Sequence, residues 1–464
     1  MKQTEIDGVA DTLIPDDWEV KNINKECTIK ARIGWQGLKS NEYLDFGDYV
    51  LITGTDFDNG FINWKSCNYV SEWRFKQDKN IQIKQGDVLI TKDGTIGKVA
   101  FLDAIPMKGT LNSGVFVIRP KSYEKIDTVF LSLIFKSIWF DSFLEQITSG
   151  STIVHLYQKD FVTFNFPIPP TLTEQQRIAK ALSDVDALIS TTEKLIQKKK
   201  NIKQGAMQNL LTSKKRLPGF GDKQTDLFVP NGTHTKEVKD VSPEQIRLSA
   251  KMKQTELGEI PEDWEVKNIN KECTIKARIG WQGLKSTEYL DSGDYILITG
   301  TDFDSGFINW KSCSYVSKWR FDQDKNIQIK RGDVLITKDG TIGKVAFLNE
   351  IPMQGTLNSG VFVIRPKNHD KIDSVFLSLI FKSFWFDSFL EQITSGSTIV
   401  HLYQKDFVKF NFPLPSKEEQ NAIANVLSSM DKEIETLNTK LEKYRNLKTA
   451  MMQQLLTGKI RLVK

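Results

Sequence analysis

The segment GDVLITKDGTIGKVAF, residues 86–101, recurs without a single change as residues 332–347. The match extends in both directions from this segment, so that residues 18–169 align with residues 264–415 in one register and without a gap. About 18 of the roughly 150 aligned positions differ, which is far closer than a shared fold requires. The chain therefore carries two copies of one domain.

A second, looser repeat follows each copy, because residues 174–217 match residues 419–462 with the helical pattern kept and most surface residues changed. The resulting order is domain, helix, domain, helix. Two nearly identical surfaces about a pseudo-twofold axis suit a symmetric partner such as duplex DNA. We predict a first domain at 1–170, a central helix at 171–217, a linker at 218–251, a second domain at 252–415 and a C-terminal helix at 416–464.

Composition excludes several classes of protein. The chain has 464 residues, 39% of them hydrophobic, which is enough for two domains of about 160 residues. No apolar run approaches the roughly 20 residues of a membrane span, and we see no secretory or transit peptide, so we expect a soluble, cytoplasmic protein. The four cysteines form no Cys-x-x-Cys pair and are expected to be buried thiols, with no metal site. A net charge of +5 permits nucleic-acid binding but does not establish it.

Each repeated domain shows the pattern of a mixed α/β fold. Short runs of β-branched residues at 49–53, 81–84, 87–91 and 115–119 lie between turn residues and predict strands. Residues 125–147 are apolar at helical spacing and predict a helical element packed on the sheet. The turn after residue 92 lacks the spacing of a phosphate loop, and Val99 stands where that motif needs a hydroxyl. We therefore exclude a nucleotide-hydrolysing fold.

The two helical segments carry apolar residues in the alternating spacing of a coiled-coil seam. Without proline for about 40 residues, each predicts a rod of roughly 60 Å. We expect the two rods to pair antiparallel; the alternative is that each packs on its own domain. The predicted seam consists of Ile178, Leu182, Val185, Ile189, Ile196, Leu210, Ile423, Leu427, Met430, Ile434, Leu437, Leu441 and Leu455, with Leu188, Leu195 and Ile202 widening the stripe.

Three polar clusters in each domain are candidates for contact with DNA, because Lys and Arg neutralise phosphates while Gln, Ser, Thr and Arg pair with base edges. In the first copy they are Lys30, Arg32, Trp35, Gln36 and Lys39; Lys92 and Lys98; and Ser151, Thr152, His155, Gln158 and Lys159. Their unchanged partners are Lys276, Arg278, Trp281, Gln282, Lys285, Lys338, Lys344, Ser397, Thr398, His401, Gln404 and Lys405. The alternatives are that Trp35 and His155 hold loops in place and that Lys30 is a solvated charge.

Four motifs stand out in the chain: GEIPEDWEV at 258–266, the strand and turn at 86–98, SGSTI at 149–153, and the specific exit motif FPIPPTLTEQQRIAKALSDVD that starts at Phe166. Together they resemble the specificity subunit of type I restriction-modification systems. This resemblance covers nearly the whole chain, twice and in order. It implies two target-recognition domains, each reading half of a bipartite DNA site, and two antiparallel spacer helices that dock two methyltransferase subunits. Restriction subunits would join through them.

In this family the two recognition domains usually differ, whereas the two domains of this chain are almost the same. We therefore predict a target that is an interrupted inverted repeat. It contains no Asn/Asp-Pro-Pro-Tyr/Phe tetrapeptide of an adenine methyltransferase and no nuclease constellation, so we expect no catalytic residues. S-adenosylmethionine and base extrusion would belong to the methyltransferase partner. The alternatives are an oligomerisation adaptor that binds proteins instead of DNA, and a self-contained methyltransferase or nuclease.

Overall fold

The computed structural model describes all of the chain except residues 7–8, 149–154, 221–250, 305, 395–400 and 463–464. It divides into two compact units, and each unit combines one repeated domain with parts of two long helices. The first unit contains Met1–Lys194 and Asn438–Lys464, and the second contains Leu195–Leu437. Most of the predicted linker at 218–251 lies outside the described residues.

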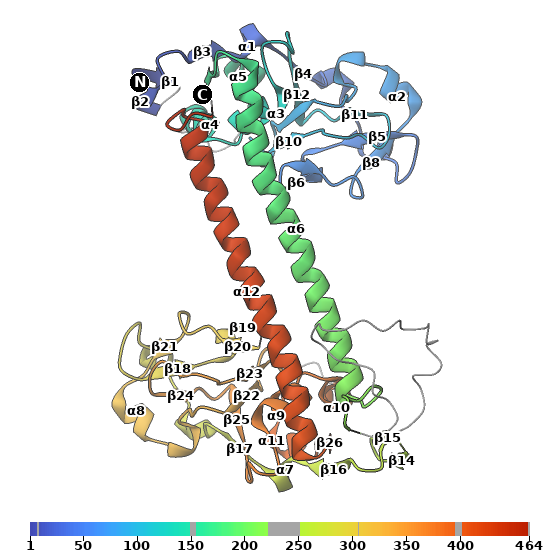
Figure 1. Cartoon of the computed structure of the whole chain (residues 1–464), viewed down its shortest axis with the longest axis vertical. Coiled ribbons are helices and arrows are strands. Elements are labelled where there is room, and N and C mark those ends of the chain that lie inside the picture. The colour runs from blue at the N-terminus through green and yellow to red at the C-terminus, as the bar shows by residue number, and fades with distance from the viewer. Residues whose placement is uncertain (7–8, 149–154, 221–250, 305, 395–400, 463–464) are drawn as a thin grey trace, which may run out of the picture. The chain divides into compact units, whose positions relative to one another are not determined.

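The first unit is a mixed α/β domain, as the sequence predicts (Figure 1). Its strands are β1 (Lys2–Ile6), β2 (Val9–Ile14), β3 (Glu19–Asn22), β4 (Cys27–Ala31), β5 (Tyr49–Ile52), β6 (Phe57–Asp58), β7 (Phe61–Ile62), β8 (Asn68–Val70), β9 (Val88–Thr91), β10 (Val99–Phe101), β11 (Gly109–Leu111), β12 (Val115–Pro120) and β13 (Asn165–Ile168). Its short helices are α1 (Ile23–Glu26), α2 (Glu72–Lys76), α3 (Thr128–Ile134), α4 (Ile138–Thr148) and α5 (Gln158–Phe161).

The second unit repeats these elements. Its strands are β14 (Met252–Thr255), β15 (Gly258–Pro261), β16 (Glu265–Asn268), β17 (Cys273–Ala277), β18 (Ile296–Ile298), β19 (Phe303–Asp304), β20 (Phe307–Ile308), β21 (Ser314–Tyr315), β22 (Val334–Thr337), β23 (Val345–Phe347), β24 (Gly355–Leu357), β25 (Val361–Pro366) and β26 (Asn411–Leu414). Its short helices are α7 (Ile269–Glu272), α8 (Lys318–Asp322), α9 (Ser374–Ile380), α10 (Phe384–Thr394) and α11 (Gln404–Phe407).

A four-stranded antiparallel sheet, in the order β10-β9-β12-β4, forms the centre of the first domain, and β17-β25-β22-β23 is its counterpart. Alternate residues of β12 enter two different cores: Phe116 and Ile118 face one, and Val115 and Val117 face the other. Because side chains alternate along a strand, a strand covered on both faces must be apolar throughout. This explains the continuous apolar runs that predicted these strands.

Two sequence expectations differ from the structure. Residues 81–84 form no strand, since a 3₁₀ turn ends at Ile81 and only Gln82 makes an isolated bridge, to Thr110. The helical element expected at 125–147 is two helices, α3 and α4, with a break between Ile134 and Ile138. The apolar spacing continues through the break because both helices bury residues in the same core.

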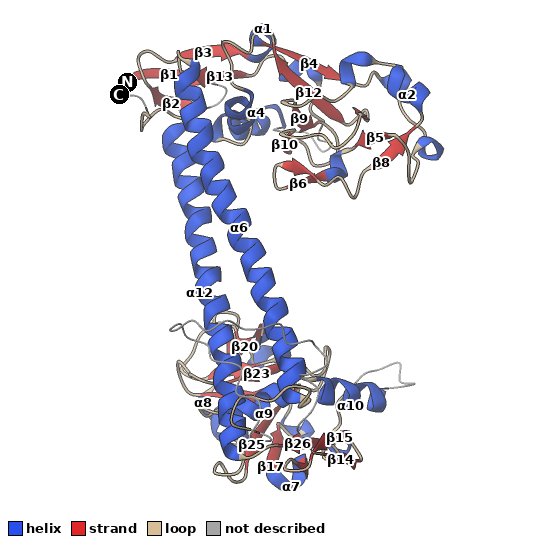
Figure 2. Ribbon diagram, turned by 45° about the vertical axis from the view of Figure 1, so that its right-hand side comes forward, coloured by secondary structure: helices blue, strands red, loops and turns tan. Residues whose placement is uncertain are grey.

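The long helices are α6 (Leu172–Leu211) and α12 (Lys417–Leu455), and their segments lie side by side within each unit (Figures 1 and 2). Ion pairs show that these segments run antiparallel. In the first unit Lys448 pairs with Asp186 at 2.6 Å and Arg445 with Glu193 at 2.8 Å. The residue later in α6 therefore pairs with the residue earlier in α12, as antiparallel helices require. In the second unit Lys199 pairs with Glu433 at 2.7 Å, and Lys203 with Asp431.

The predicted seam is largely buried, and the residues at its ends also pack into the cores of the domains. Ile178, Leu182 and Leu455 belong to the core of the first domain, and Leu210, Ile423 and Leu427 to that of the second. Both expectations therefore hold in part: the helices pair, and their ends pack on the domains. Among the remaining seam positions Val185, Ile196, Ile434 and Leu441 are buried, and Ile189, Met430 and Leu437 are partly buried. Leu188, Leu195 and Ile202 are exposed and do not widen the seam.

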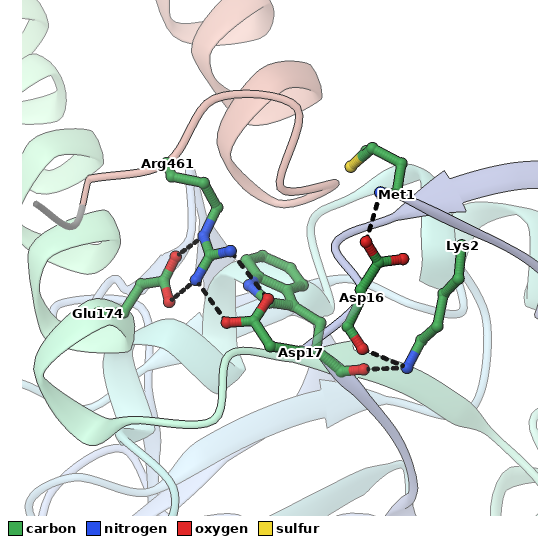
Figure 3. A network of polar contacts seen from close by, with 7 residues as sticks. Met1, Lys2, Asp16, Asp17, Glu174 and Arg461 are labelled. Atoms are coloured by element: carbon green, nitrogen blue, oxygen red, sulfur yellow. Dashed lines mark hydrogen bonds and ion pairs between the residues drawn. The ribbon is translucent and has the colours of Figure 1, made fainter.

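The residues that follow each long helix close a domain. In the first unit Arg461 lies between the carboxylates of Glu174 and Asp17, and both hydrogen-bond its guanidinium (Figure 3). In the second unit Arg216 makes the equivalent bonds to Glu419 and Asp263. Each domain is thus completed by the chain segment that follows the other copy's helix.

Candidate nucleic-acid interface

A cavity of about 280 Å³ opens in the second domain where strands β17 and β22 end and helix α11 begins. Its lining combines charged, aromatic and small residues from four segments. They are Ala277, Arg278, Ile279 and Gly280; Lys338 and Asp339; Phe362; and His401, Leu402, Tyr403 and Gln404. Residues from all three polar clusters that the sequence predicts therefore line this cavity.

Hydrogen bonds between these segments hold them together. The backbone N–H of Leu402 donates to the carbonyl of Lys338 at 2.9 Å, and the Gln404 side chain donates to the carbonyl of Ile275 at 3.4 Å. His401 Nδ1 and Asp339 Oδ1 are 2.8 Å apart. The loop that carries the histidine is therefore tied both to the end of β22 and to strand β17.

The first domain makes the same bonds. Leu156 N–H donates to the Lys92 carbonyl at 2.9 Å, and Gln158 donates to the Ile29 carbonyl at 3.4 Å. His155 Nδ1 lies 2.9 Å from Asp93 Oδ1. Two surfaces with the same residues also share the same local geometry.

Most of the predicted contact residues whose side chains the structure describes are exposed. Lys30, Lys39, Lys98, His155, Gln158 and Lys159 are exposed, as are Lys276, Lys285, Lys344, His401, Gln404 and Lys405. Lys92 and Lys338 are partly buried, and their ammonium groups lie 5.4 Å from the ring centres of Phe116 and Phe362. A cation held over an aromatic face near the cavity mouth is available to a polar or anionic ligand.

Arg32 and Gln36 are placed differently from what the sequence suggested, and so are Arg278 and Gln282 in the second copy. Arg32 is 1% exposed, and its guanidinium donates to the Leu111 carbonyl at 2.9 Å and to Thr110 Oγ1 at 3.2 Å. Burial, with the neighbouring Arg74, lowers its pKa. Gln36 is 6% exposed. Burial argues against direct DNA contact by all four residues. Arg32 and Arg278 are also bonded inside their domains, whereas the side-chain oxygens of Gln36 and Gln282 are buried without a hydrogen-bond partner.

Four of the predicted contact residues lie outside the described residues: Ser151, Thr152, Ser397 and Thr398. The side chains of Trp35 and Trp281 lie outside them as well. Their candidate roles remain predictions.

Two functional candidates were missed in each copy. Asp93 and Asp339 orient the histidines, and Tyr157 and Tyr403 are exposed by 55% and 56% beside them. The Lys159 ammonium lies 5.6 Å from the Tyr157 ring centre. Their position next to predicted residues was a usable signal, but the aspartate–histidine bond joins residues 62 apart in sequence, which the pattern does not reveal.

The positions that differ between the copies avoid this cavity. Gln85 and Arg331, one of the differing pairs, precede β9 and β22, whereas Lys92 and Lys338 follow those strands. They therefore lie at the opposite end of the strand. The first domain has the same residue at each of the 11 positions that line the cavity of the second, because none of them is among the differences.

The thiols show no sign of reactivity. Cys27, Cys67, Cys273 and Cys313 are free and buried, and burial raises the pKa of each to about 12. Within the described part of the chain no group of three or more His, Cys, Asp or Glu residues could hold a metal ion. Among the same residues no helix is long and apolar enough to span a membrane.

Two α/β domains carry the same polar cluster, and each packs against segments of two long antiparallel helices. Comparison with known proteins shows the family to which the chain belongs. The family model for the type I restriction modification DNA specificity domain matches residues 15–203 and again residues 261–443. The chain belongs to this family.

The chain is similar to the MjaVIII specificity subunit of a type I restriction enzyme from Methanocaldococcus jannaschii, at 28% identity over 97% of this chain and 94% of that protein. It is 24% identical to the EcoBI specificity subunit of Escherichia coli over 68% of this chain and 62% of that protein. A crystal structure of the type I S subunit from M. genitalium matches with a TM-score of 0.53 at 14% identity, covering 95% of this chain and 96% of that one. That structural match supports the fold.

Proposed function

We propose that this chain is the DNA-reading, non-catalytic specificity subunit of a type I restriction-modification complex, and that its two domains read two half-sites of the same sequence. The observation that carries the proposal is the duplicated polar cluster. The residues that line the cavity of the second domain are unchanged in the first domain, and the histidine–aspartate distances are 2.9 and 2.8 Å. Surfaces with the same donors and acceptors in the same places must prefer the same bases.

We further propose that the two half-sites are inverted, which makes the target an interrupted inverted repeat. This orientation is supported by the antiparallel pairing of α6 and α12 that the ion pairs define in each unit. A twofold relation between recognition elements is matched by a palindromic arrangement of half-sites in other DNA-binding proteins.

Chemistry would be supplied by partners. We propose that methyltransferase subunits, two per chain, dock near α6 and α12, and that restriction subunits can join them. S-adenosylmethionine would bind the methyltransferase, which would also extrude the target adenine. The protein-binding adaptor hypothesis is not favoured, since the family is one of DNA specificity domains.

The test is to map DNA methylation in a host that produces this chain together with its methyltransferase subunits. We expect one motif with two identical half-sites on opposite strands, both methylated. A motif whose two halves are unrelated in sequence would overturn the proposal of equal reading. It would assign specificity to the few differing positions. Identical half-sites in the same orientation would overturn the proposed twofold relation.

A further inference from the structure

The histidine of each polar cluster has a defined hydrogen-bonding state. Asp339 Oδ1 lies 2.8 Å from His401 Nδ1, and a carboxylate can only accept, so the ring hydrogen is on Nδ1. In the neutral ring Nε2 then carries a lone pair and accepts hydrogen bonds. The imidazole is 39% exposed, and within the described part of the chain no residue is bonded to Nε2. The same holds for His155 with Asp93.

The charges around this acceptor favour a neutral ligand over a phosphate. Lys338 contributes a positive charge at the cavity, and Asp339 places a negative charge beside it. The other cation, Arg278, is 2% exposed and donates inward to the carbonyl of Leu357 at 2.9 Å and to Thr356. A phosphate at Nε2 would meet the charge of Asp339, and Nε2 of this tautomer has no hydrogen to donate to a phosphate oxygen. A base edge carries no net charge and meets no such repulsion.

Backbone hydrogen bonds hold the segment that carries the aspartate. The N–H of Lys338, which precedes Asp339, donates to the carbonyl of Gly360 at 2.9 Å. The loop with the histidine is fixed by the backbone bond from Leu402 to Lys338. Donor and acceptor are thus held from two independent segments, which preorganises Nε2 for one direction of approach.

We propose that His155 and His401 each read one base pair of a half-site, with Nε2 accepting a hydrogen bond from the exocyclic amino group of a base. In the major groove these donors are adenine N6 and cytosine N4. Asp93 and Asp339 are positioning residues that select the tautomer. This inference rests on the proposed function and names the residue that recognises one base pair of each half-site.

The first test is His401→Asn in the full chain, produced with its methyltransferase subunits. Asparagine can keep the bond to Asp339 but has no atom at the position of Nε2. Methylation is measured on a site library randomised in both half-sites. We expect discrimination at one base pair of one half-site to fall by about 2- to 13-fold, the range for one neutral hydrogen bond. The half-site read by the intact His155 remains unchanged, which gives an internal control.

His369→Asn is the matched control, because His369 is an exposed histidine of the same unit that is absent from the cavity lining. We expect it to leave both half-sites unchanged. Unchanged discrimination in His401→Asn, or an equal loss on all sequences, would overturn the proposal. If His369→Asn produced the same change as His401→Asn, the proposal would also be overturned.

The second test is Asp339→Asn, which separates positioning from simple support. An amide can donate to Nδ1 and so permits the tautomer with hydrogen on Nε2, which turns the acceptor into a donor. We expect the preference at the same base pair to move toward guanine or thymine, whose major-groove edges accept. A uniform loss of methylation without a change of preferred base would overturn the tautomer argument. Failure of the proposed function would look different, since the wild-type chain would then show no inverted repeat.

Discussion

Arg216→Ala should destabilise the second unit strongly, because it leaves a buried carboxylate without its partner. The Arg216 and Glu419 side chains are 8% and 1% exposed, and their nitrogen and oxygen atoms approach to 2.5 Å. Burial lowers the pKa of Arg216, but its hydrogen bonds to Glu419 and Asp263 raise it more, so the arginine stays charged. Removing one member of a buried ion pair costs about 3–5 kcal/mol.

We expect the low end of that range, about 3 kcal/mol, because Trp264 Nε1 still donates to Glu419 at 3.0 Å. Asp263→Ala is the control: it removes the other partner of the same arginine, but that carboxylate is 59% exposed. Exposed ion pairs contribute about 0–1 kcal/mol. The double variant Arg216→Met/Glu419→Met should cost less than Arg216→Ala, because no charge remains buried alone.

The assay is urea unfolding of the full chain followed by tryptophan fluorescence, with the slope compared between variants. Equal small losses for Arg216→Ala and Asp263→Ala would refute the reasoning. A double variant less stable than Arg216→Ala would show that the pair itself, and not the stranded charge, supplies the stability.

Three further predictions follow from single residues. Burial lowers the pKa of Lys382 to about 8. Between pH 8 and 10 the unfolded chain therefore binds more protons than the folded chain, and the free energy of unfolding rises with pH. Lys382→Met should add about 2 kcal/mol to the free energy of unfolding at pH 7, after allowance for partial exposure, and little at pH 10. Thermal unfolding at the two pH values measures this, and an equal gain at both would contradict it. Lys92→Ala and Lys338→Ala should each lower the log–log salt dependence of DNA binding by about one unit if each lysine meets a phosphate, and an unchanged slope would exclude that contact. Leu427→Asp should cost several kcal/mol and weaken assembly with methyltransferase subunits, since Leu427 is fully buried where α12 meets the second domain; normal thermal stability would contradict this packing.

The structure also shows why substitutions at the seam are ambiguous tests of helix pairing. Leu182 and Leu427 each lie in a domain core as well as on a long helix, so a charge there disrupts both. The ion pair of Glu193 with Arg445 joins α6 and α12, and both side chains are exposed. Exchanging these two charges tests the pairing without changing a core residue.

The sequence by itself determined the duplication, the α/β class of the domains and the two long helices. Repetition of about 150 residues is visible without coordinates, and strand and helix periods follow from the regular spacing of side chains. Surface lysines such as Lys30 and Lys98 could be recognised as well, because charged side chains are rarely buried.

Only the tertiary structure decided which polar residues are available. Arg32 and Lys30 look equally suited to DNA in the sequence, yet Arg32 meets Thr110 and the carbonyl of Leu111 inside the domain. The bond between Asp93 and His155 likewise depends on bringing two distant segments together. Local patterns report which face of a strand or helix is apolar, but hydrogen-bond partners are set by the packing of segments far apart in the chain, which no short-range pattern encodes.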